Sequence, residues 1–331
     1  MCASKIPLIQ TLDTISPEDI EIHGGKATNI ARLNRAGFCI PRGFSISSRN
    51  FIRMINETPE INKLLDRLKE VDDFEEILVL ADKLQTLVNS YQMAEDLKSE
   101  ISREFQRLQK LQIGSEWGYA VRSSATIEDR HDISFAGQAE SHLCVKEISN
   151  IFDAVKQVWK SVYSPSAAIY LKTKGVPMSQ VKMAVVVQEM IPAIVSGVMF
   201  TVNVVNNNTK EMLINATWGL GETLVSGKVI PDTFILSKNP LNVIQQEMGA
   251  KEITSCAVIS EGNAGTSTLT APREKREKLS LESHELLKVA QLGLEIERQM
   301  GLPQDIEWCI KPDGEIVILQ SRPITTLRIP G

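Results

Sequence analysis

The segment DIEWCIKPDGEIVILQSRPITT, residues 305–326, constrains the fold more than any other part of the chain. Two apolar runs flank Asp313-Gly314 in this segment. An Asp-Gly pair between such runs predicts a β-hairpin with a two-residue type I′ turn, because that turn needs positive φ at both central residues. The segment is therefore expected to fold as two antiparallel strands in a fixed register.

Four polar residues fall on one face of this predicted hairpin. In that register Glu307 faces Gln320 and Asp305 faces Arg322, and side-chain alternation places all four on the same face. The opposite face carries apolar side chains and is expected to meet the core: Ile306, Trp308, Ile310, Val317 and Leu319. Opposed Cβ atoms lie about 5 Å apart, so Glu307 and Gln320 could share a hard cation such as Mg²⁺. A solvated face with an Asp–Arg cross-strand pair explains the same residues equally well.

Composition sets the size and class of the protein. The chain has 331 residues, 43% hydrophobic and 23% charged, which is enough for two domains or one two-lobed unit. Helical patterns alternate irregularly with strand-like runs, with two or three helices expected in 51–112 and a charged helix in 272–300. Several strands follow one another directly. This mixture predicts an α+β fold, with lobe 1 at about 1–184 and lobe 2 at about 185–331.

Charge, cysteines and hydropathy exclude several classes of protein. The net charge of −5 argues against a nucleic-acid-binding protein. The five cysteines form no CxxC pair, which argues against a zinc site or a disulfide framework. No signal peptide is recognised at the start, and the apolar stretch 183–200 is interrupted by polar residues and proline. We expect a cytoplasmic protein that contacts neither membrane nor nucleic acid.

Three further segments have the composition of ligand-binding loops. HGGKATN, residues 23–29, places two glycines and Lys26 at a helix start, where anions are favoured. The segment 120–138 leads from Arg122 through small hydroxyl residues to SFAGQ, a possible lid over phosphates. NATWGLGETLVSGKVIPD, residues 215–232, could wrap a ligand or merely form turns. Each segment also fits an ordinary turn or surface loop.

Together these segments resemble the ATP-binding domain of the phosphoenolpyruvate synthase, pyruvate phosphate dikinase and rifampicin phosphotransferase family. The matching blocks are HGGKATNIARLNRAGFCIPRGFSIS, YAVRSSATIEDRHDISFAGQ, VVVQEMIPAIVSGVMFT, TWGLGETLVSGKVIPD and PQDIEWCIKPDGEIVILQSRPITT. The resemblance implies an ATP-grasp fold, with ATP and Mg²⁺ in a cleft between two lobes. It also implies transfer of the β-phosphoryl of ATP to a histidine on a swivelling domain, with AMP and phosphate as by-products. A third domain then passes the phosphoryl group to pyruvate or an antibiotic hydroxyl.

The resemblance assigns phosphate-binding and catalytic roles. Lys26 matches a phosphate contact, and Gly137 and Gln138 match the loop over the phosphates. Arg122 matches an arginine that holds phosphates, and Arg322 matches the catalytic arginine. Both arginines would neutralise charge on the transferred phosphoryl group.

It also assigns residues to the base and the metal. Gln188, Glu189 and Ile191 fall on the adenine-binding edge, with backbone groups expected to act at Glu189 and Ile191. Glu307 and Gln320 match the Mg²⁺ ligands.

The chain also departs from the family pattern. Ala27 replaces the usual glycine after the lysine, and FTVNV at 200–204 replaces FTxDP, so Asn203 receives no role. Family members continue with acceptor-binding and histidine domains, the latter with a Gly-Gly…Ser-His segment. Ser283-His284 lies in a charged stretch without glycines and is not that segment. The phosphohistidine is therefore expected on another domain or chain.

Three functions are compatible with these observations. The first is a dikinase-type phosphotransferase domain that releases AMP. The second is a nucleotide-binding regulatory module without catalysis, and the third is an ATP-grasp ligase that makes an acyl phosphate and ADP. The final acceptor, the oligomeric state and the choice between fragment and stand-alone protein stay open.

Overall fold

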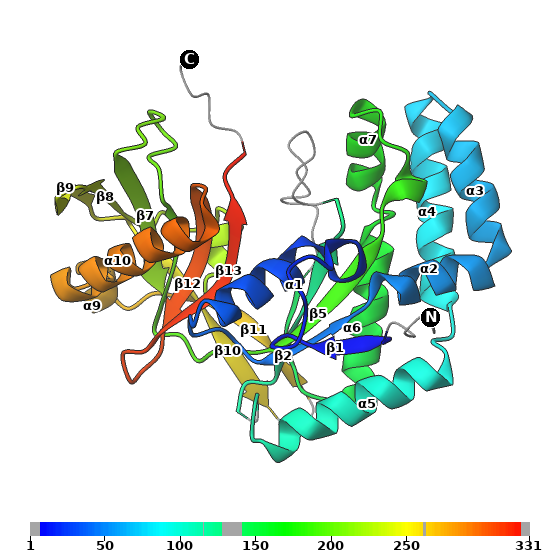
Figure 1. Cartoon of the computed structure of the whole chain (residues 1–331), viewed down its shortest axis with the longest axis horizontal. Helices are drawn as coiled ribbons and strands as arrows, with labels where there is room; N and C mark the ends of the chain where they lie inside the picture. Colours follow the sequence, from blue (N-terminus) through cyan, green and yellow to red (C-terminus); the bar gives the residue numbers. More distant parts are fainter. Residues whose placement is uncertain (1–6, 115, 128–140, 261–262, 326–331) are drawn as a thin grey trace. The chain divides into compact units, whose positions relative to one another are not determined.

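A computed structural model of the chain describes residues 7–114, 116–127, 141–260 and 263–325. The chain forms two compact units. Unit 1 comprises Met1–Ala31 and Arg42–Met190, and unit 2 comprises Arg32–Pro41 and Ile191–Gly331. Each unit combines helices with its own antiparallel sheet (Figure 1), which confirms the predicted α+β class.

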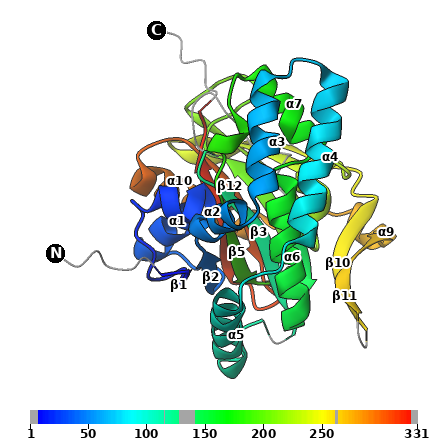
Figure 2. The same cartoon turned by 90° about the vertical axis from the view of Figure 1, so that its right-hand side faces the viewer.

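Unit 1 is built on a five-stranded sheet with the strand order β1-β2-β5-β3-β4. The strands are β1 Ile9–Thr11, β2 Gly43–Ile46, β3 Tyr119–Ala125, β4 Ser141–Val145 and β5 Met183–Glu189. The helices are α1 Ile20–Arg35, whose last residues belong to unit 2, α2 Ser48–Glu57, α3 Pro59–Glu70, α4 Phe74–Ser90, α5 Glu95–Lys110, α6 Ile148–Ser161, α7 Pro165–Thr173 and the 3₁₀ turn η1 Met178–Gln180. Figure 2 shows α3, α4 and α6 running side by side in this unit.

The region 51–112, expected to hold two or three helices, contains α3, α4 and α5 and most of α2. The extra break lies between α2 and α3, where Thr58 ends one helix and Pro59 starts the next. Proline is well suited to the first helical position, because its missing N–H has no partner there in any case. Apolar residues recur at helical spacing on both sides of the break, with Phe51 and Met54 before it and Ile61 and Leu65 after it, so the spacing alone does not show where one helix ends.

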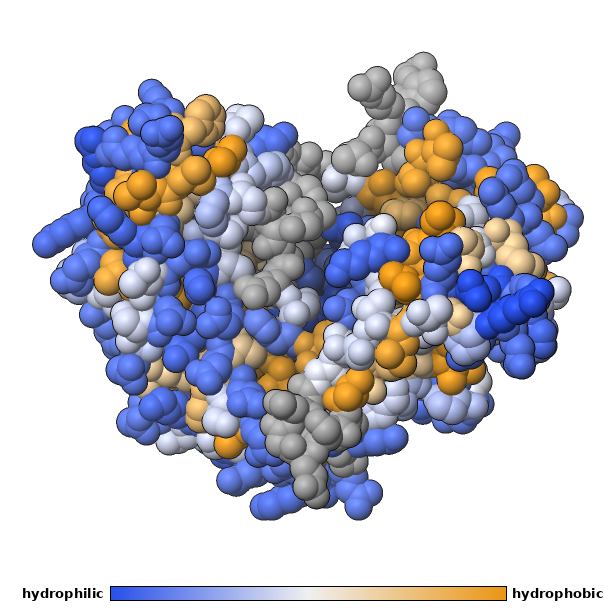
Figure 3. All heavy atoms as spheres, turned by 180° about the vertical axis from the view of Figure 1, so that it is seen from behind, coloured by the Kyte–Doolittle hydropathy of each residue, from blue (hydrophilic) through white to orange (hydrophobic). Residues whose placement is uncertain are grey.

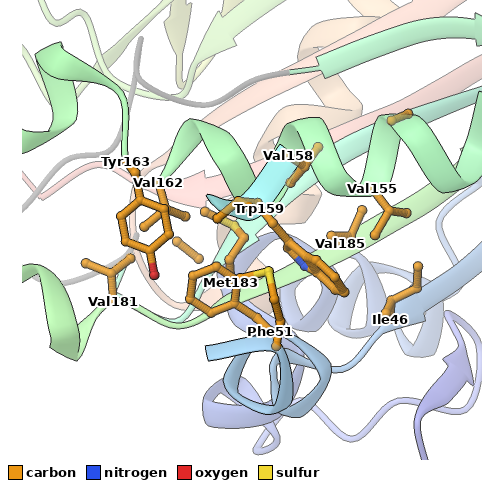
Figure 4. Packing of buried hydrophobic residues seen from close by; sticks show 14 of the residues in the cluster. Ile46, Phe51, Val155, Val158, Trp159, Val162, Tyr163, Val181, Met183 and Val185 are labelled. Atoms are coloured by element: carbon orange, nitrogen blue, oxygen red, sulfur yellow. The ribbon is translucent and has the colours of Figure 1, made fainter. Parts of the chain in front are cut away.

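The core of unit 1 lies on one face of its sheet, beneath α2 and α6. Phe51 of α2 stacks on Tyr163 with ring centroids 6.0 Å apart and meets the edge of Trp159 at 6.3 Å. Figure 4 shows these rings packed against Met183 and Val185 of β5. Alternation along β5 therefore leaves Ala184, Val186 and Gln188 on the opposite face.

Unit 2 is built on a six-stranded sheet with the order β13-β12-β6-β7-β8-β9, beside a two-stranded sheet β10-β11. The strands are β6 Val195–Phe200, β7 Glu211–Trp218, β8 Asp232–Lys238, β9 Leu241–Glu247, β10 Ile253–Ser260, β11 Asn263–Thr270, β12 Gln304–Ile310 and β13 Ile316–Pro323. The helices are α8 Glu222–Val225, α9 Arg273–Arg276 and α10 Ser283–Met300. The single helix expected over 272–300 is thus two helices, because a capping box of Glu282 and Glu285 starts α10 anew.

One face of the six-stranded sheet packs against α10, as Figure 1 shows. Ile306 and Trp308 of β12 lie in this core with Val289 and Ala290 of α10. Gly197 of β6 makes room for the indole, since a Cβ there would lie 2.1 Å from the Trp308 ring. The alternate residues of these strands, which include Glu307, therefore lie on the other face.

The surface shows no extended apolar belt on the face drawn in Figure 3, where hydrophobic side chains form separate groups among hydrophilic ones. Among the described helices, none combines the length and apolar character needed to cross a bilayer.

Candidate functional site

The HGGK segment is pressed against strand β3. Gly24 has φ +73 and breaks α1, and a Cβ at this position would lie 2.1 Å from the carbonyl oxygen of Ser124. The Ser124 hydroxyl donates to the carbonyl of His23 at 2.7 Å and accepts from the N–H of Ala27 at 3.2 Å. Only glycine fits this approach, and the approach fixes the start of the helical turn that carries Lys26. Lys26 is 8% exposed.

His23 has a structural role beneath this turn. Its ring nitrogens lie 3.0 Å from Ser45 Oγ and 3.1 Å from Gln10 Oε1. Burial lowers the pKa of His23 to about 4, against the opposing effect of Asp19. The imidazole is therefore neutral near pH 7, and both of its nitrogens are engaged.

Arg122 lies on the same face of β3 as Ser124, two residues away. Because Ser124 contacts the HGGK turn, the sheet face that carries Arg122 is the face on which α1 begins. Unit 1 thus brings Arg122 and the turn bearing Lys26 to one surface. Gly137 and Gln138, the predicted lid residues, lie outside the described residues.

The predicted adenine edge begins on the same face of the unit 1 sheet. Gln188 pairs with Ala120 of β3 and Gly43 of β2, so its side chain shares the face of Arg122. Gln188 is 3% exposed, and its Oε1 has no hydrogen-bond partner among the described residues. A buried acceptor without a partner costs about 1–3 kcal/mol, so this oxygen is suited to a ligand N–H.

Glu189 is engaged with the chain that enters β2. Its N–H donates to the carbonyl of Arg42 at 2.8 Å, and its Oε1 accepts from the N–H of Arg42 at 2.8 Å. A backbone contact from Glu189 to a base would therefore use its carbonyl oxygen. Ile191 is half-buried and belongs to unit 2.

The hairpin of β12 and β13 has the predicted pairs of polar residues. Glu307 lies opposite Gln320, and Asp305 lies opposite Arg322. Glu307 is half-buried and Gln320 is 6% exposed. A carboxylate and an amide oxygen on adjacent strands are hard donors that fit Mg²⁺, provided that phosphate and water complete its coordination.

The turn of this hairpin differs from the predicted type I′ turn. Lys311 and Glu315 close a three-residue loop through a 3.0 Å bond, and Gly314 donates to the carbonyl of Lys311 at 2.9 Å. Gly314 has φ +84. This is the pattern of a type I turn followed by a left-handed glycine, and it suits the proline at 312.

A bulge in β13 restores the register. Trp308 pairs with Ile318 whereas Glu307 pairs with Gln320, so Leu319 is an extra residue between them. Ile318 therefore joins the core beside Trp308, and the expectation that Val317 and Leu319 share that core face is wrong.

Asp305 holds Arg322 in a defined position. The Arg322 Nε and Nη2 atoms donate to Asp305 Oδ2 at 2.9 and 2.7 Å. Burial raises the pKa of the Asp305 carboxyl, and the neighbouring Arg322 opposes that rise. The predicted register places Asp305 opposite Arg322. This cross-strand pairing is the sequence feature from which a carboxylate that positions Arg322 could have been predicted, although no such role was assigned to Asp305.

Two further findings bear on the site. The Asn203 side chain donates to Glu211 at 2.7 Å and accepts from the N–H of Val205 at 3.1 Å, which is a structural role. Within the described ranges, no three His, Cys, Asp or Glu side chains gather closely enough to hold a metal ion by themselves. A cation at Glu307 and Gln320 would therefore depend on ligands from the substrate.

Relatives of the chain are long enzymes of which it matches one part. Probable phosphoenolpyruvate synthase from Methanocaldococcus jannaschii is 34% identical over 326 residues, which cover 98% of this chain and 27% of that protein. Phosphoenolpyruvate synthase from Pyrococcus furiosus is 34% identical, covering 97% of this chain and 44% of that protein. Rifampicin phosphotransferase from Bacillus subtilis is 32% identical, and the match covers 97% of this chain and 36% of that protein. The chain thus spans less than half the length of these relatives.

The chain is also similar to a solved structure and to a family model. D-alanyl-alanine synthetase A from Vibrio cholerae superposes with a TM-score of 0.28 and 13% identity, over 68% of this chain and 46% of that one. The model of the pyruvate phosphate dikinase AMP/ATP-binding domain matches residues 20–329. The match spans both units, and this chain belongs to the pyruvate phosphate dikinase AMP/ATP-binding domain family.

Proposed function

We propose that this chain is the ATP-binding half of a dikinase-type phosphotransferase. It binds ATP with Mg²⁺ and directs the β-phosphoryl group to a histidine on another domain or chain. The bond between the α- and β-phosphates breaks, a phosphorus–nitrogen bond forms to the imidazole, and AMP leaves. Water then releases the γ-phosphate as inorganic phosphate.

The observation that carries the proposal is the arrangement of Glu307, Gln320 and Arg322 on one face of the unit 2 hairpin. Arg322 is held by Asp305 and can present its guanidinium to a phosphate. The opposed oxygens of Glu307 and Gln320 would hold the cation that neutralises the polyphosphate when it is bound. An Asp–Arg pair alone would also suit a solvated sheet face, but such a face does not explain why the amide of Gln320, opposite Glu307, is only 6% exposed.

Unit 1 carries the other residues proposed to contact the phosphates and the base. Lys26 and Arg122 would neutralise charge on the transferred group, which is the main requirement for phosphoryl transfer. Gln188 would accept a hydrogen bond from the base through its unpaired Oε1. Glu189 and Ile191 would contact the base through backbone groups, and Gly137 and Gln138 would cover the phosphates.

The nucleotide product tests this proposal. The chain is incubated with ATP, Mg²⁺ and a separate protein fragment that carries the acceptor histidine, and the nucleotides are separated. AMP with a phosphorylated acceptor is the expected result. ADP with an acyl phosphate would identify a ligase instead. Tight ATP binding that survives Glu307→Ala, without any AMP, would identify a regulatory module.

The final acceptor is a second step. The relatives named phosphoenolpyruvate synthase and rifampicin phosphotransferase point to pyruvate or a rifampicin-like antibiotic as candidates. Supplying each candidate, together with the remaining domains of such a relative, would show which one takes up the phosphoryl group.

A further inference from the structure

A row of side chains crosses the unit 2 sheet at the level of Glu307. Gln320 lies opposite Glu307, Glu307 opposite Val198, Val198 opposite Asn215, and Asn215 opposite Thr233. Directly opposed residues point to the same face of a sheet. Asn215 therefore lies on the face of the proposed metal ligands, away from the core beneath α10.

Asn215 is an unusual residue for its position in the strand. Its neighbours Ile214 and Ala216 are buried in the core, whereas Asn215 is half-buried on the other face. Thr233 Oγ1 donates to Asn215 Oδ1 at 3.0 Å, which fixes the rotation of the amide. The amide nitrogen diverges from that oxygen, and among the described residues nothing accepts a hydrogen bond from it. The strand thus presents an oriented N–H donor.

The spacing of the row indicates which part of a nucleotide would meet this donor. Two strand separations lie between Glu307 and Asn215, about 10 Å in total. An extended nucleoside triphosphate covers such a span between its terminal phosphates and its sugar. Val198 lies between the two residues and is half-buried, so the exposed part of its side chain offers an apolar surface to the carbon edge of a sugar.

We propose that Asn215 binds a ribose hydroxyl of ATP through its side-chain amide nitrogen, with Thr233 as the residue that orients it. This inference rests on the ATP binding proposed above and adds recognition of the sugar to it. It also gives a role to the start of the glycine-containing segment 215–232. A cross-strand pair that only stabilised the sheet would need no donor directed away from its partner.

Affinities for ATP, 2′-deoxy-ATP and 3′-deoxy-ATP test the proposal. They are measured by calorimetry with Mg²⁺ on the full chain and on Asn215→Ala. The variant should bind ATP about three- to tenfold more weakly, the loss expected for one hydrogen bond. It should bind one of the deoxy analogues as well as the unaltered chain does, because that analogue lacks the hydroxyl in question. Asn242→Ala on exposed β9 is the matched control and should bind all three nucleotides normally.

A second pair of variants separates binding from folding. Thr233→Val keeps the amide but frees its rotation, so it should lose part of the ATP affinity, and Thr233→Ser should restore it. The inference is overturned if Asn215→Ala binds ATP normally, or if its affinity falls by the same factor for ATP and for both deoxy analogues. It is also overturned if a folded Thr233→Val variant keeps full affinity. If the unaltered chain does not bind ATP, the proposed function itself is refuted. If it binds ATP but the variants behave as just described, only the role of Asn215 is refuted.

Discussion

Replacing Asp305 with Asn removes the charge that holds Arg322 and keeps nearly the same side-chain shape. Both bonds from the guanidinium end on Asp305 Oδ2, at 2.9 and 2.7 Å. Loss of one partner from a buried ion pair costs about 3–5 kcal/mol. The Asp305 side chain is 12% exposed but that of Arg322 is 34% exposed, so solvent screens the loss and we expect about 2 kcal/mol.

That energy should appear in catalysis if Arg322 must be held in place for the phosphoryl transfer. A loss of 2 kcal/mol of transition-state stabilisation corresponds to a roughly 30-fold slower AMP formation. Initial rates of AMP release measure this effect, and urea unfolding of the same samples reports the change in stability.

A matched control is the exposed pair of Arg53 and Asp96. Arg53 donates to the Asp96 carboxylate at 2.9 and 2.7 Å, but the side chains are 37% and 56% exposed. Asp96→Asn should therefore change the free energy of unfolding by about 1 kcal/mol or less and leave AMP formation unchanged. An Asp305→Asn variant that is folded and forms AMP at the normal rate would refute the positioning role. So would an equal loss of rate in Asp96→Asn.

Three further predictions concern stability and ATP binding. The imidazole of His23 takes up a proton near pH 4 in the folded state and near pH 6.5 in the unfolded state, so the free energy of unfolding should fall by about 3 kcal/mol as the pH drops from 6.5 to 4. Urea titrations at several pH values should show a smaller pH dependence of that free energy in a folded His23→Gln variant. Gly24→Ala should displace α1 and weaken ATP binding, because the added Cβ would lie 2.1 Å from the carbonyl oxygen of Ser124. As a control, the Cβ of Gly37→Ala meets no atom within 4 Å, so a thermal melt should show a loss of only about 1 kcal/mol from backbone strain. Asp232→Asn should destabilise unit 2 by about 3–5 kcal/mol, because it leaves the fully buried ammonium of Lys251 without its charge partner. Denaturant unfolding should show that the double variant Asp232→Asn with Lys251→Met regains part of the lost free energy of unfolding.

The hairpin shows how far the sequence could predict the site. The pairing of Glu307 with Gln320 followed from an assumed two-residue loop, and the observed loop has three residues. The extra residue Leu319 in β13 offsets the longer loop, so the pairing is correct although the turn type is not. Bulges depend on tertiary packing, here on the placement of Trp308 in the core, and local sequence carries little trace of them.

Other features of the site depend on contacts between distant segments. The sequence indicated that HGGK starts a helix, but not that Gly24 meets Ser124 a hundred residues later. The amphipathic spacing predicted helices in 51–112, but not the break before Pro59, because apolar residues recur at helical spacing on both sides of it. The sequence could not show that Asn215 lies in the same cross-strand row as Glu307, two strands away, because this alignment depends on the order of three strands.

The fate of the β-phosphorus of ATP tests the proposed function most directly. ATP labelled at the β-position is mixed with Mg²⁺, the chain and a fragment that carries the acceptor histidine. The label should move to the acceptor in an acid-labile form while unlabelled AMP accumulates. Label retained in ADP, or an acceptor labelled only when the γ-phosphorus carries the isotope, would contradict a dikinase-type transfer.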